Sequence, residues 1–265
     1  MTLKEKYGDL ALIAGASEGI GAAYARQLAV EGINMILIAR GKDQLDRFAS
    51  ELTTQYGIEV KTLQEDLSDP DAASRIIDQL KDYPINIFIY NAGNSYIGKF
   101  EEKEWNVHKE IAFTNMITPM QLTHQLAPAM LERGKGAIIF MASLAGFQGT
   151  PFIATYAATK AFDQILAESL WYEWKDRGVD VLACCAGATS SPNFLKTNPG
   201  KQHFLAPKVQ TPEEVVTECL KRLGKTPSFI SGRANKMASF FMRRILSRKK
   251  AVVTMGDTTK KMYGL

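Results

Sequence analysis

Short apolar runs alternate with amphipathic segments along most of this 265-residue chain. Runs that are apolar throughout are typical of strands covered on both faces of a sheet. Strands separated by helices form βαβ units, which give a parallel sheet with right-handed crossovers. We therefore predict an α/β domain with a doubly wound parallel sheet, whose ligands gather at the carboxyl ends of the strands. The predicted strands are 10–14, 34–39, 60–67, 85–90, 136–141 and 179–184, with a last short one at 229–231.

Helical patterns fill the segments between these runs. Ser68, Asp69 and Pro70 predict a helix start with proline in the first turn. A long helical pattern covers 102–133, and its prolines at 119 and 128 should kink or divide it. The other predicted helices run from the glycines at 15–21 to about 31, over 43–56, from 156 to about 176, and from a capping box at 211–214 onward.

No internal repeat or linker divides the chain before about residue 233. We predict a Rossmann-type domain over 1–232, followed by a basic helical extension over 233–265. The extension holds nine Lys or Arg and one acid, Asp257, for a net charge of +8. The total is +4, so the remainder of the chain carries −4. The basic character therefore belongs to the tail and not to the body.

Within the tail, residues 234–250 predict one helix with an apolar side and a basic side. A basic amphipathic helix can lie on an anionic membrane surface. It can also dock on the protein through its apolar side and leave the basic edge in solvent. We favour docking over peripheral membrane contact, and we expect no nucleic-acid binding without a second basic patch. The apolar residues are Met237, Phe240, Phe241 and Ile245, and the basic ones are Arg243, Arg244, Arg248, Lys249 and Lys250.

Composition is ordinary for a soluble globular protein, with 46% apolar and 23% charged residues. No apolar run approaches the roughly 18 residues of a transmembrane helix, and the N-terminus lacks the apolar region of a signal peptide. We therefore expect a cytoplasmic protein. The cysteines, Cys184, Cys185 and Cys219, fit a reducing compartment without disulfides. Neither they nor the histidines show ligand spacing, so we expect no metal site.

A glycine-rich turn follows the first strand and opens the first helix. Gly15, Gly19 and Gly21 allow unusual backbone angles and let the chain approach a pyrophosphate closely. The helix N-terminus adds free amides and a positive dipole end. The alternative is a glycine turn without a ligand, but the strand–turn–helix context favours a dinucleotide site.

The end of the second strand discriminates between cofactors. An acid there binds a ribose 2′-hydroxyl, whereas an arginine accommodates a 2′-phosphate. Here Ala39 is followed by Arg40, with no acid before Asp43. This pattern favours NADP over NAD, although Glu18 argues mildly the other way and Arg40 also fits an ordinary surface arginine.

Tyr156 and Lys160 lie one turn apart on a predicted helix, and so on the same face. A nearby ammonium favours the phenolate form of a tyrosine, which allows the phenol to exchange protons near neutral pH. Such a tyrosine acts as a general acid or base. The pair alone is weak support for catalysis, because this spacing arises readily by chance.

Taken with further motifs, these residues resemble the short-chain dehydrogenase/reductase family, in its compact single-domain branch. The match covers about residues 8–190, with the motifs in the family's order and spacing. The resemblance implies a Rossmann sheet of about seven parallel strands and hydride transfer between a nicotinamide and a carbonyl or alcohol. The further motifs are Asn91-Ala92-Gly93, Asn115 and Ser143.

The resemblance also implies roles for four catalytic residues. Tyr156 would protonate the carbonyl oxygen during reduction or deprotonate the alcohol in reverse. Lys160 would assist the phenol and hold the nicotinamide ribose. Ser143 would donate a hydrogen bond to the substrate oxygen. Asn115 would support a water relay to the lysine, although a structural helix asparagine is an alternative interpretation.

Cofactor contacts follow from the same motifs. Beside Tyr156 and Lys160, the implied set is Gly15, Ser17, Glu18, Gly19, Ile20, Gly21, Arg40, Asp66, Leu67, Asn91, Ala92, Gly93, Gly187 and Thr189. Asp66 also fits a helix cap. The chain departs from the family at Cys185-Ala186-Gly187, where a proline usually precedes the glycine. We therefore expect this loop to be less rigid than its family counterpart.

The substrate side is the least informative part of the sequence. Residues 190–209 correspond to the variable substrate lid of the family. The resemblance also implies a homodimer or homotetramer.

Two functions stay open: an NADP-dependent carbonyl reductase or alcohol dehydrogenase, and a non-catalytic NADP-binding regulatory protein. The intact Ser143, Tyr156 and Lys160 favour the enzyme. Apolar residues that suggest a pocket for an apolar substrate, or simply pack, are Gly146, Phe147, Pro151, Phe152, Phe194, Leu195, Phe204 and Leu205.

Overall fold

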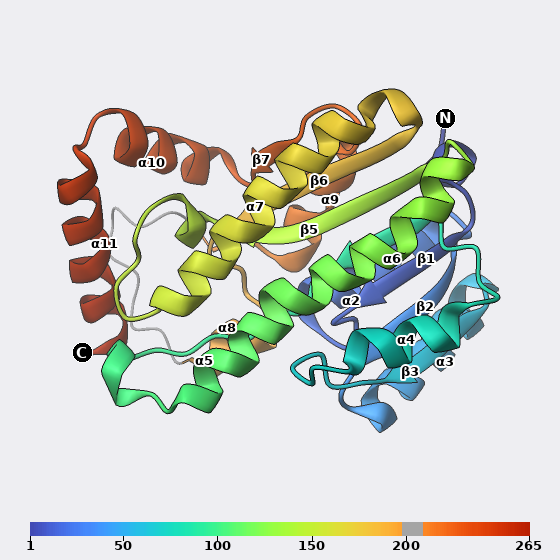
Figure 1. The fold of residues 1–265 in the computed structure, drawn as a ribbon, viewed down its shortest axis with the longest axis horizontal. Coiled ribbons are helices and arrows are strands. Elements are labelled where there is room, and N and C mark those ends of the chain that lie inside the picture. The colour runs from blue at the N-terminus through green and yellow to red at the C-terminus, as the bar shows by residue number, and fades with distance from the viewer. Residues whose placement is uncertain (198–208) are drawn as a thin grey trace.

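One sheet of seven parallel strands organises the protein, as the computed structural model shows over residues 1–197 and 209–265 (Figure 1). The strand order is β3-β2-β1-β4-β5-β6-β7, which confirms the predicted doubly wound Rossmann sheet. The strands are β1 Leu10–Ala14, β2 Asn34–Ala39, β3 Val60–Gln64, β4 Ile87–Tyr90, β5 Gly136–Ser143, β6 Val179–Ala186 and β7 Ser228–Ile230.

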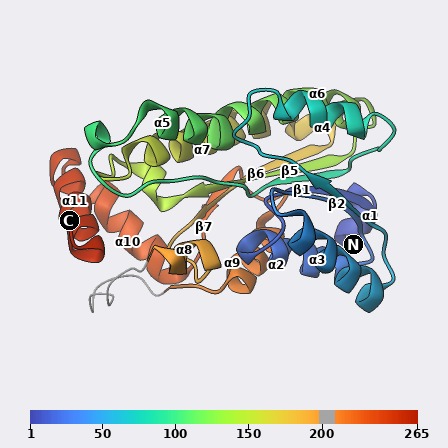
Figure 2. The ribbon, with the colours of Figure 1, turned by 90° about the horizontal axis from the view of Figure 1, so that it is seen from below.

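Helices cover both faces of this sheet, so the molecule has three layers (Figure 2). One face carries α2, α3 and α9, and the other carries α4, α5, α6 and α7. The α-helices are α1 Leu3–Tyr7, α2 Gly19–Val30, α3 Lys42–Tyr56, α4 Ala72–Leu80, α5 Trp105–Ala112, α6 Thr118–Glu132, α7 Ala154–Trp174, α8 Pro192–Lys196, α9 Pro212–Arg222, α10 Arg233–Arg244 and α11 Arg248–Tyr263.

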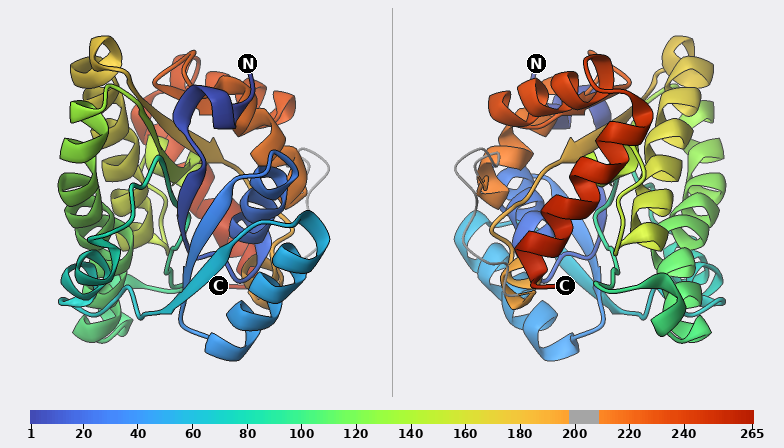
Figure 3. Two further views of the ribbon diagram at one scale, coloured as in Figure 1. Left: turned by 90° about the vertical axis from the view of Figure 1, so that its right-hand side faces the viewer. Right: turned by 90° about the vertical axis from the view of Figure 1, so that its left-hand side faces the viewer.

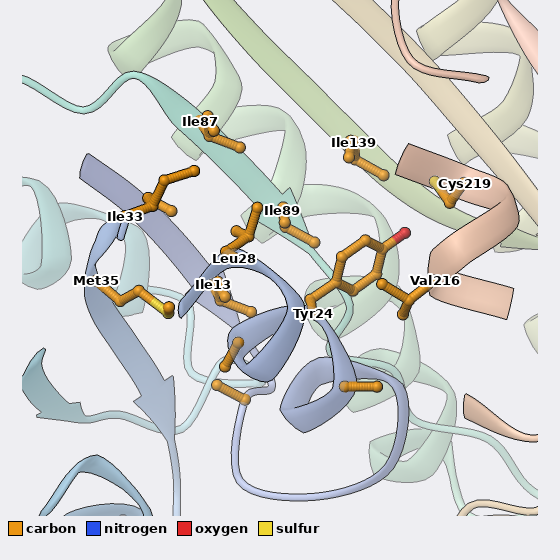
Figure 4. Close-up of a cluster of buried hydrophobic side chains, with 14 of the residues drawn as sticks. Ile13, Tyr24, Leu28, Ile33, Met35, Ile87, Ile89, Ile139, Val216 and Cys219 are labelled. Atoms are coloured by element: carbon orange, nitrogen blue, oxygen red, sulfur yellow. The ribbon is translucent and has the colours of Figure 1, made fainter. Parts of the chain in front are cut away.

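Neighbouring strand residues serve opposite halves of the core, because side chains alternate across a sheet. Ile13 belongs to the cluster beneath α2 and α9, where it packs with Tyr24 and Leu28 (Figure 4). Leu12 belongs to the cluster on the other face, with Phe88. The three cysteines are unpaired and buried, with Cys184 and Cys219 in the first cluster and Cys185 in the second.

The order in which successive strands are added to the sheet reverses at β1, which pairs with β2 on one side and β4 on the other. Ala14 at the end of β1 is in register with Ile38 and with Tyr90. The segments that follow β1, β2 and β4 therefore leave the same edge of the sheet together. This is the topological switch point at which doubly wound sheets bind ligands.

Two helix predictions need correction or refinement. The helix expected to start at 68–70 begins at Ala72 instead, because Asp69 holds a preceding turn: its carboxylate accepts the Asp71 amide at 2.8 Å and its carbonyl accepts the Ala72 amide at 3.1 Å. The long 102–133 pattern is divided, but not at either of its prolines, because Pro119 lies in the first turn of α6. A π-helical segment, Phe113–Ile117, separates α5 from α6, and Pro128 lies inside α6.

The tail forms two helices, so the prediction of one helix over 234–250 is wrong (Figure 3, right panel). α10 ends at Arg244, and Ser247 caps α11 by accepting the Lys250 amide. Docking through the apolar side is also wrong, because α10 buries Asn235 and Ser239 instead. The apolar residues are exposed: Met237 by 74%, Phe240 by 63%, Phe241 by 52% and Ile245 by 61%.

Among the described residues, none of the helices combines the length and apolar character needed to cross a bilayer.

Gly178 lies in the turn before β6, in close contact with the turn before β5, and it allows this contact to be tested. It precedes β6 with φ +76°, and a Cβ there would collide with the Gly134 carbonyl. We predict that Gly178→Ala lowers the free energy of unfolding by about 2 kcal/mol or more, from left-handed strain plus the collision. Denaturant unfolding measures this loss. Gly41→Ala is the control, because Gly41 has φ −88° and open space around it, and an equal loss there would contradict the argument.

Candidate active site

The glycine turn after β1 is held tightly against the neighbouring strands. The amides of Gly15 and Ala16 donate to the Ile38 carbonyl at 2.9 and 3.2 Å. Gly15 has φ +78°, and a Cβ there would lie 2.7 Å from Ala92 Cα. The Asn91 side-chain amide donates to the Gly15 carbonyl at 2.8 Å. The turn therefore needs a residue without a side chain and brings Asn91 and Ala92 directly beside it.

The N-terminus of α2 opens from this turn. A Cβ on Gly21 would collide with the Gly15 carbonyl, so the first turn of the helix packs directly on the loop. Glu18 occupies the N-cap position without a side-chain capping bond. The leading amides of α2 are thus left to bind an anion, which the helix dipole favours. Ser17 precedes this position and Ile20 follows in the first turn of α2, and the Ser17 carbonyl accepts from Gln44 at 3.1 Å.

The ends of β2 and β3 contribute the next part of the site. Arg40 is exposed at the end of β2, and its guanidinium makes no hydrogen bond or ion pair within residues 1–197 and 209–265. The Gln64 side chain donates to the Arg40 carbonyl at 3.2 Å. Asp66 accepts from the amide and hydroxyl of Ser68 at 3.0 and 2.8 Å, whereas Leu67 is buried. Asp66 therefore stabilises a turn ahead of α4 and is not its N-cap, which is Asp71.

Lys160 lies deep in the protein in a buried ion pair that sequence analysis missed. Its Nζ donates to Asp163 Oδ2 at 2.9 Å and to the Met141 carbonyl at 2.7 Å. The two side chains are only 5% and 2% exposed, and Asp163 Oδ1 has no partner among the described residues. Burial opposes the charge on Lys160, yet Asp163 and the phenol of Tyr156 raise the pKa of the ammonium. Burial raises the pKa of Asp163, and Lys160 opposes this rise.

Tyr156 and Ser143 lie at the same end of the sheet as Lys160. Tyr156 is half-buried in the first turn of α7, with Lys160 Nζ 5.9 Å from the centre of its ring. Ser143 is the last residue of β5, and its hydroxyl accepts the Ala145 amide at 3.2 Å. The hydroxyl proton of Ser143 remains available to a substrate oxygen.

Asn115 lies in the π-helical segment and is fully buried. Its Oδ1 accepts the Asn94 amide at 2.8 Å, and its Nδ2 donates to the Asn94 carbonyl at 2.9 Å and to Thr159 at 3.0 Å. A Cβ on Gly93 would lie 3.9 Å from both Asn115 Oδ1 and Lys160 Nζ. Gly93 thus lies beside both the asparagine and the lysine, and π-helical segments of this kind are frequent at functional sites.

The loop after β6 is braced by the tail. Thr189 donates to the Gly187 carbonyl at 3.1 Å and pairs with Gln210. A Cβ on Gly187 would lie 2.6 Å from Asn235 Nδ2, so α10 packs directly on this glycine. Without the family's proline, the loop obtains its support from Asn235. Sequence analysis had no signal for this contact, which joins residues 48 positions apart.

Of the lid predicted at 190–209, the structure describes residues 190–197 and 209, and Phe204 and Leu205 lie outside the described residues. Its first part approaches the glycine turn, because a Cβ on Gly19 would lie 2.9 Å from Ser191 Cβ. Phe194 and Leu195 are in the short helix α8, with Phe194 half-buried and Leu195 exposed.

The tail also packs on the loop that follows β5. The Arg243 guanidinium lies 4.3 Å from the centre of the Phe147 ring, and Arg248 donates to the Phe147 carbonyl at 2.8 Å. Lys260 Nζ lies 5.6 Å from the centre of the Phe152 ring, and a Cβ on Gly256 would lie 3.1 Å from Pro151. Phe147, Pro151 and Phe152 were predicted as pocket residues, and here they contact α10 and α11.

Comparison with known proteins places this geometry in a family. A model of the family described as short chain dehydrogenase matches residues 9–202. A 7beta-hydroxysteroid dehydrogenase of Clostridium sardiniense is 34% identical over 236 residues, which cover 89% of this chain and 90% of the relative.

Solved structures agree with that match. A structure described for 7beta-hydroxysteroid dehydrogenase stereoselectivity superimposes with a TM-score of 0.90 at 30% identity, covering 96% of this chain and 99% of the other. A short-chain dehydrogenase from Sphingobium yanoikuyae in complex with NADPH gives a TM-score of 0.75 at 30% identity, covering 84% and 87%. The chain is therefore a member of the short-chain dehydrogenase family and an oxidoreductase by descent.

Proposed function

We propose that this protein is an NADP-dependent dehydrogenase that interconverts a ring ketone and a secondary alcohol on a bulky, apolar substrate of the hydroxysteroid class. The observation that carries the proposal is the buried Lys160 ammonium one turn from Tyr156, with Gly93 beside it. The substrate class rests on similarity to 7beta-hydroxysteroid dehydrogenases.

The residues present fit a phosphorylated dinucleotide. Side-chain-free positions at Gly15 and Gly21 leave the backbone open to close approach, and the α2 amides lack a side-chain cap. Arg40 provides a cation for a 2′-phosphate at the end of β2, with no acid before Asp43. Lys160 would hold the nicotinamide ribose, and Thr189 would reach the nicotinamide carboxamide. Asn91, in the loop after β4, would line the cofactor. When bound, NADP supplies or accepts the hydride.

The chain's own residues handle the proton. Tyr156 donates its phenolic proton to the carbonyl oxygen during reduction and removes it from the alcohol during oxidation. Ser143 donates a hydrogen bond to the same oxygen and stabilises the charge that develops on it. The Lys160 ammonium stabilises the phenolate that remains. Asn115 holds the segment after β4 beside Lys160 through its two bonds to Asn94.

Tyr156→Phe tests the proposal most directly. We predict that turnover of NADPH with steroid ketones falls about 100-fold or more, because the proton donor is lost, while NADPH binding stays unchanged. NADPH oxidation is followed by absorbance over steroid ketones, small ketones and acyl thioester ketones, and binding by fluorescence titration. Tyr172→Phe, an exposed phenol on the same helix, is the control. Equal activity of both variants, or binding without turnover in the unmodified protein, would instead favour a regulatory NADP-binding protein.

Arg40→Asp tests the cofactor. We predict that KM for NADPH rises by about 10- to 100-fold, from loss of a charge-assisted bond, and that NADH becomes the better cofactor. Initial rates at varied NADPH and NADH measure this. Arg47→Asp makes the same charge change on the exposed surface of α3 and should leave the preference unaltered. A similar effect of both variants would assign the result to overall charge.

Asp163→Asn tests the buried ion pair through pH. Asp163 raises the pKa of Lys160, so neutralising Asp163 lowers that pKa. The Lys160 ammonium beside Tyr156 is then lost at lower pH. We predict that the alkaline loss of kcat/KM for reduction moves down by about half a pH unit or more. Asp180→Asn, which breaks the 2.7 Å pair with Lys6, is the control. An unmoved alkaline limb in Asp163→Asn would overturn this role.

A further inference from the structure

Helix α10 has an unusual orientation, with polar residues inward and large apolar residues outward. Asn235 and Ser239 are buried on the inner side, where Asn235 donates to the Ser231 carbonyl at 2.8 Å and to Gln210 at 3.2 Å. The outer side is defined by Met237, Phe240, Phe241 and Ile245, which we call the tail face. At i, i+3, i+4 and i+8 these residues form one stripe along the helix.

The rest of the tail holds this orientation in place. The ring contact of Arg243 and the hydrogen bond of Arg248 tie both ends of the α10–α11 connection to Phe147. Ala251 and Gly256 of α11 are buried, and Gly256 lies against Pro151 in the loop after β5. The helix is therefore fixed by its inner contacts, and the tail face stays presented to solvent.

The two tail helices carry exposed cations as well as the tail face. The exposed basic residues include Lys236, Arg244, Lys249 and Lys250, and none of these forms an ion pair with the described residues. Beside α10, a groove of about 550 Å³ between α7, β7 and α10 is lined by three cations, Arg222, Lys236 and Arg243, and by one acid, Glu168. Positive charge therefore predominates on the surface next to the helix.

We propose that the tail face docks on an anionic lipid surface, with its apolar side chains at the acyl boundary and the exposed cations on the headgroups. A lipid surface of that charge complements both features at once. A symmetric contact with a second copy would instead set this +8 segment against itself, because such interfaces use the same patch twice. The proposal does not depend on which substrate is reduced.

Vesicle binding by the full chain tests this. We expect at least tenfold tighter co-sedimentation with vesicles of phosphatidylcholine and phosphatidylglycerol than with phosphatidylcholine alone, weakening as salt rises. The double variant Phe240→Ser, Phe241→Ser should lose at least tenfold in binding, and so should Arg244→Glu, Lys249→Glu. The matched control is Trp105→Ser, Tyr172→Ser, which removes two exposed aromatic residues elsewhere. Steroid ketone reduction and thermal unfolding, measured without vesicles, should be unchanged in the two aromatic double variants.

Equal binding to both vesicle types, or full binding by the Phe240→Ser, Phe241→Ser variant, would overturn the proposal. A second outcome would also overturn it: the unmodified protein does not bind vesicles, and light scattering shows that it is a stable oligomer which the Phe240→Ser, Phe241→Ser variant converts into a monomer. The tail face would then be an interface between copies of the chain. If vesicles bind as expected while no ketone is reduced, the proposed function fails and the docking surface stands.

Discussion

The close approach of two backbone segments at the carboxyl end of β1 is the constraint on which the site depends. Gly15 turns out of β1 against Ala92, and the Asn91 amide bonds back to the Gly15 carbonyl. This contact joins the loop after β4 to the first turn of α2. Because Gly93 follows directly and lies beside Lys160, this contact also links the N-terminus of α2 to the buried ammonium. A side chain at Gly15 would force these two parts of the site apart.

The Lys160–Asp163 ion pair is better explained by the place at which it holds the Lys160 ammonium than by any gain in folding stability. Two charges removed from water lose much of their solvation, and their attraction rarely repays more than that loss. One oxygen of Asp163 also lacks a partner among the described residues, so the pair is not fully satisfied. What the pair achieves is to keep an ammonium at a defined point, held between Asp163 and the Met141 carbonyl, one turn from Tyr156.

Much of this arrangement could be predicted from sequence, because it depends on local patterns. Apolar runs located all seven strands, and the parallel order then placed Arg40 and the glycine turn at one edge. The Asp163 contact could not be predicted in this way. Its spacing of three residues from Lys160 equally suits an exposed helix pair, and nothing local shows that both side chains point into the core. The start of α4 was missed because Asp69 stabilises a turn where a proline suggested a helix.

The tail shows the same limit more sharply. Periodicity identifies which side of a helix is apolar, but it does not determine which side faces the protein. That choice follows from what the body offers: the Ser231 carbonyl and Gln210 need donors, and Gly187 leaves room for the Asn235 amide. With the polar side required inward, helix geometry places Met237, Phe240 and Phe241 outward. The contacts on the inner side of α10 do not require apolar residues at these outer positions. Their large apolar side chains are therefore better explained by contact with a binding partner than by packing within the chain.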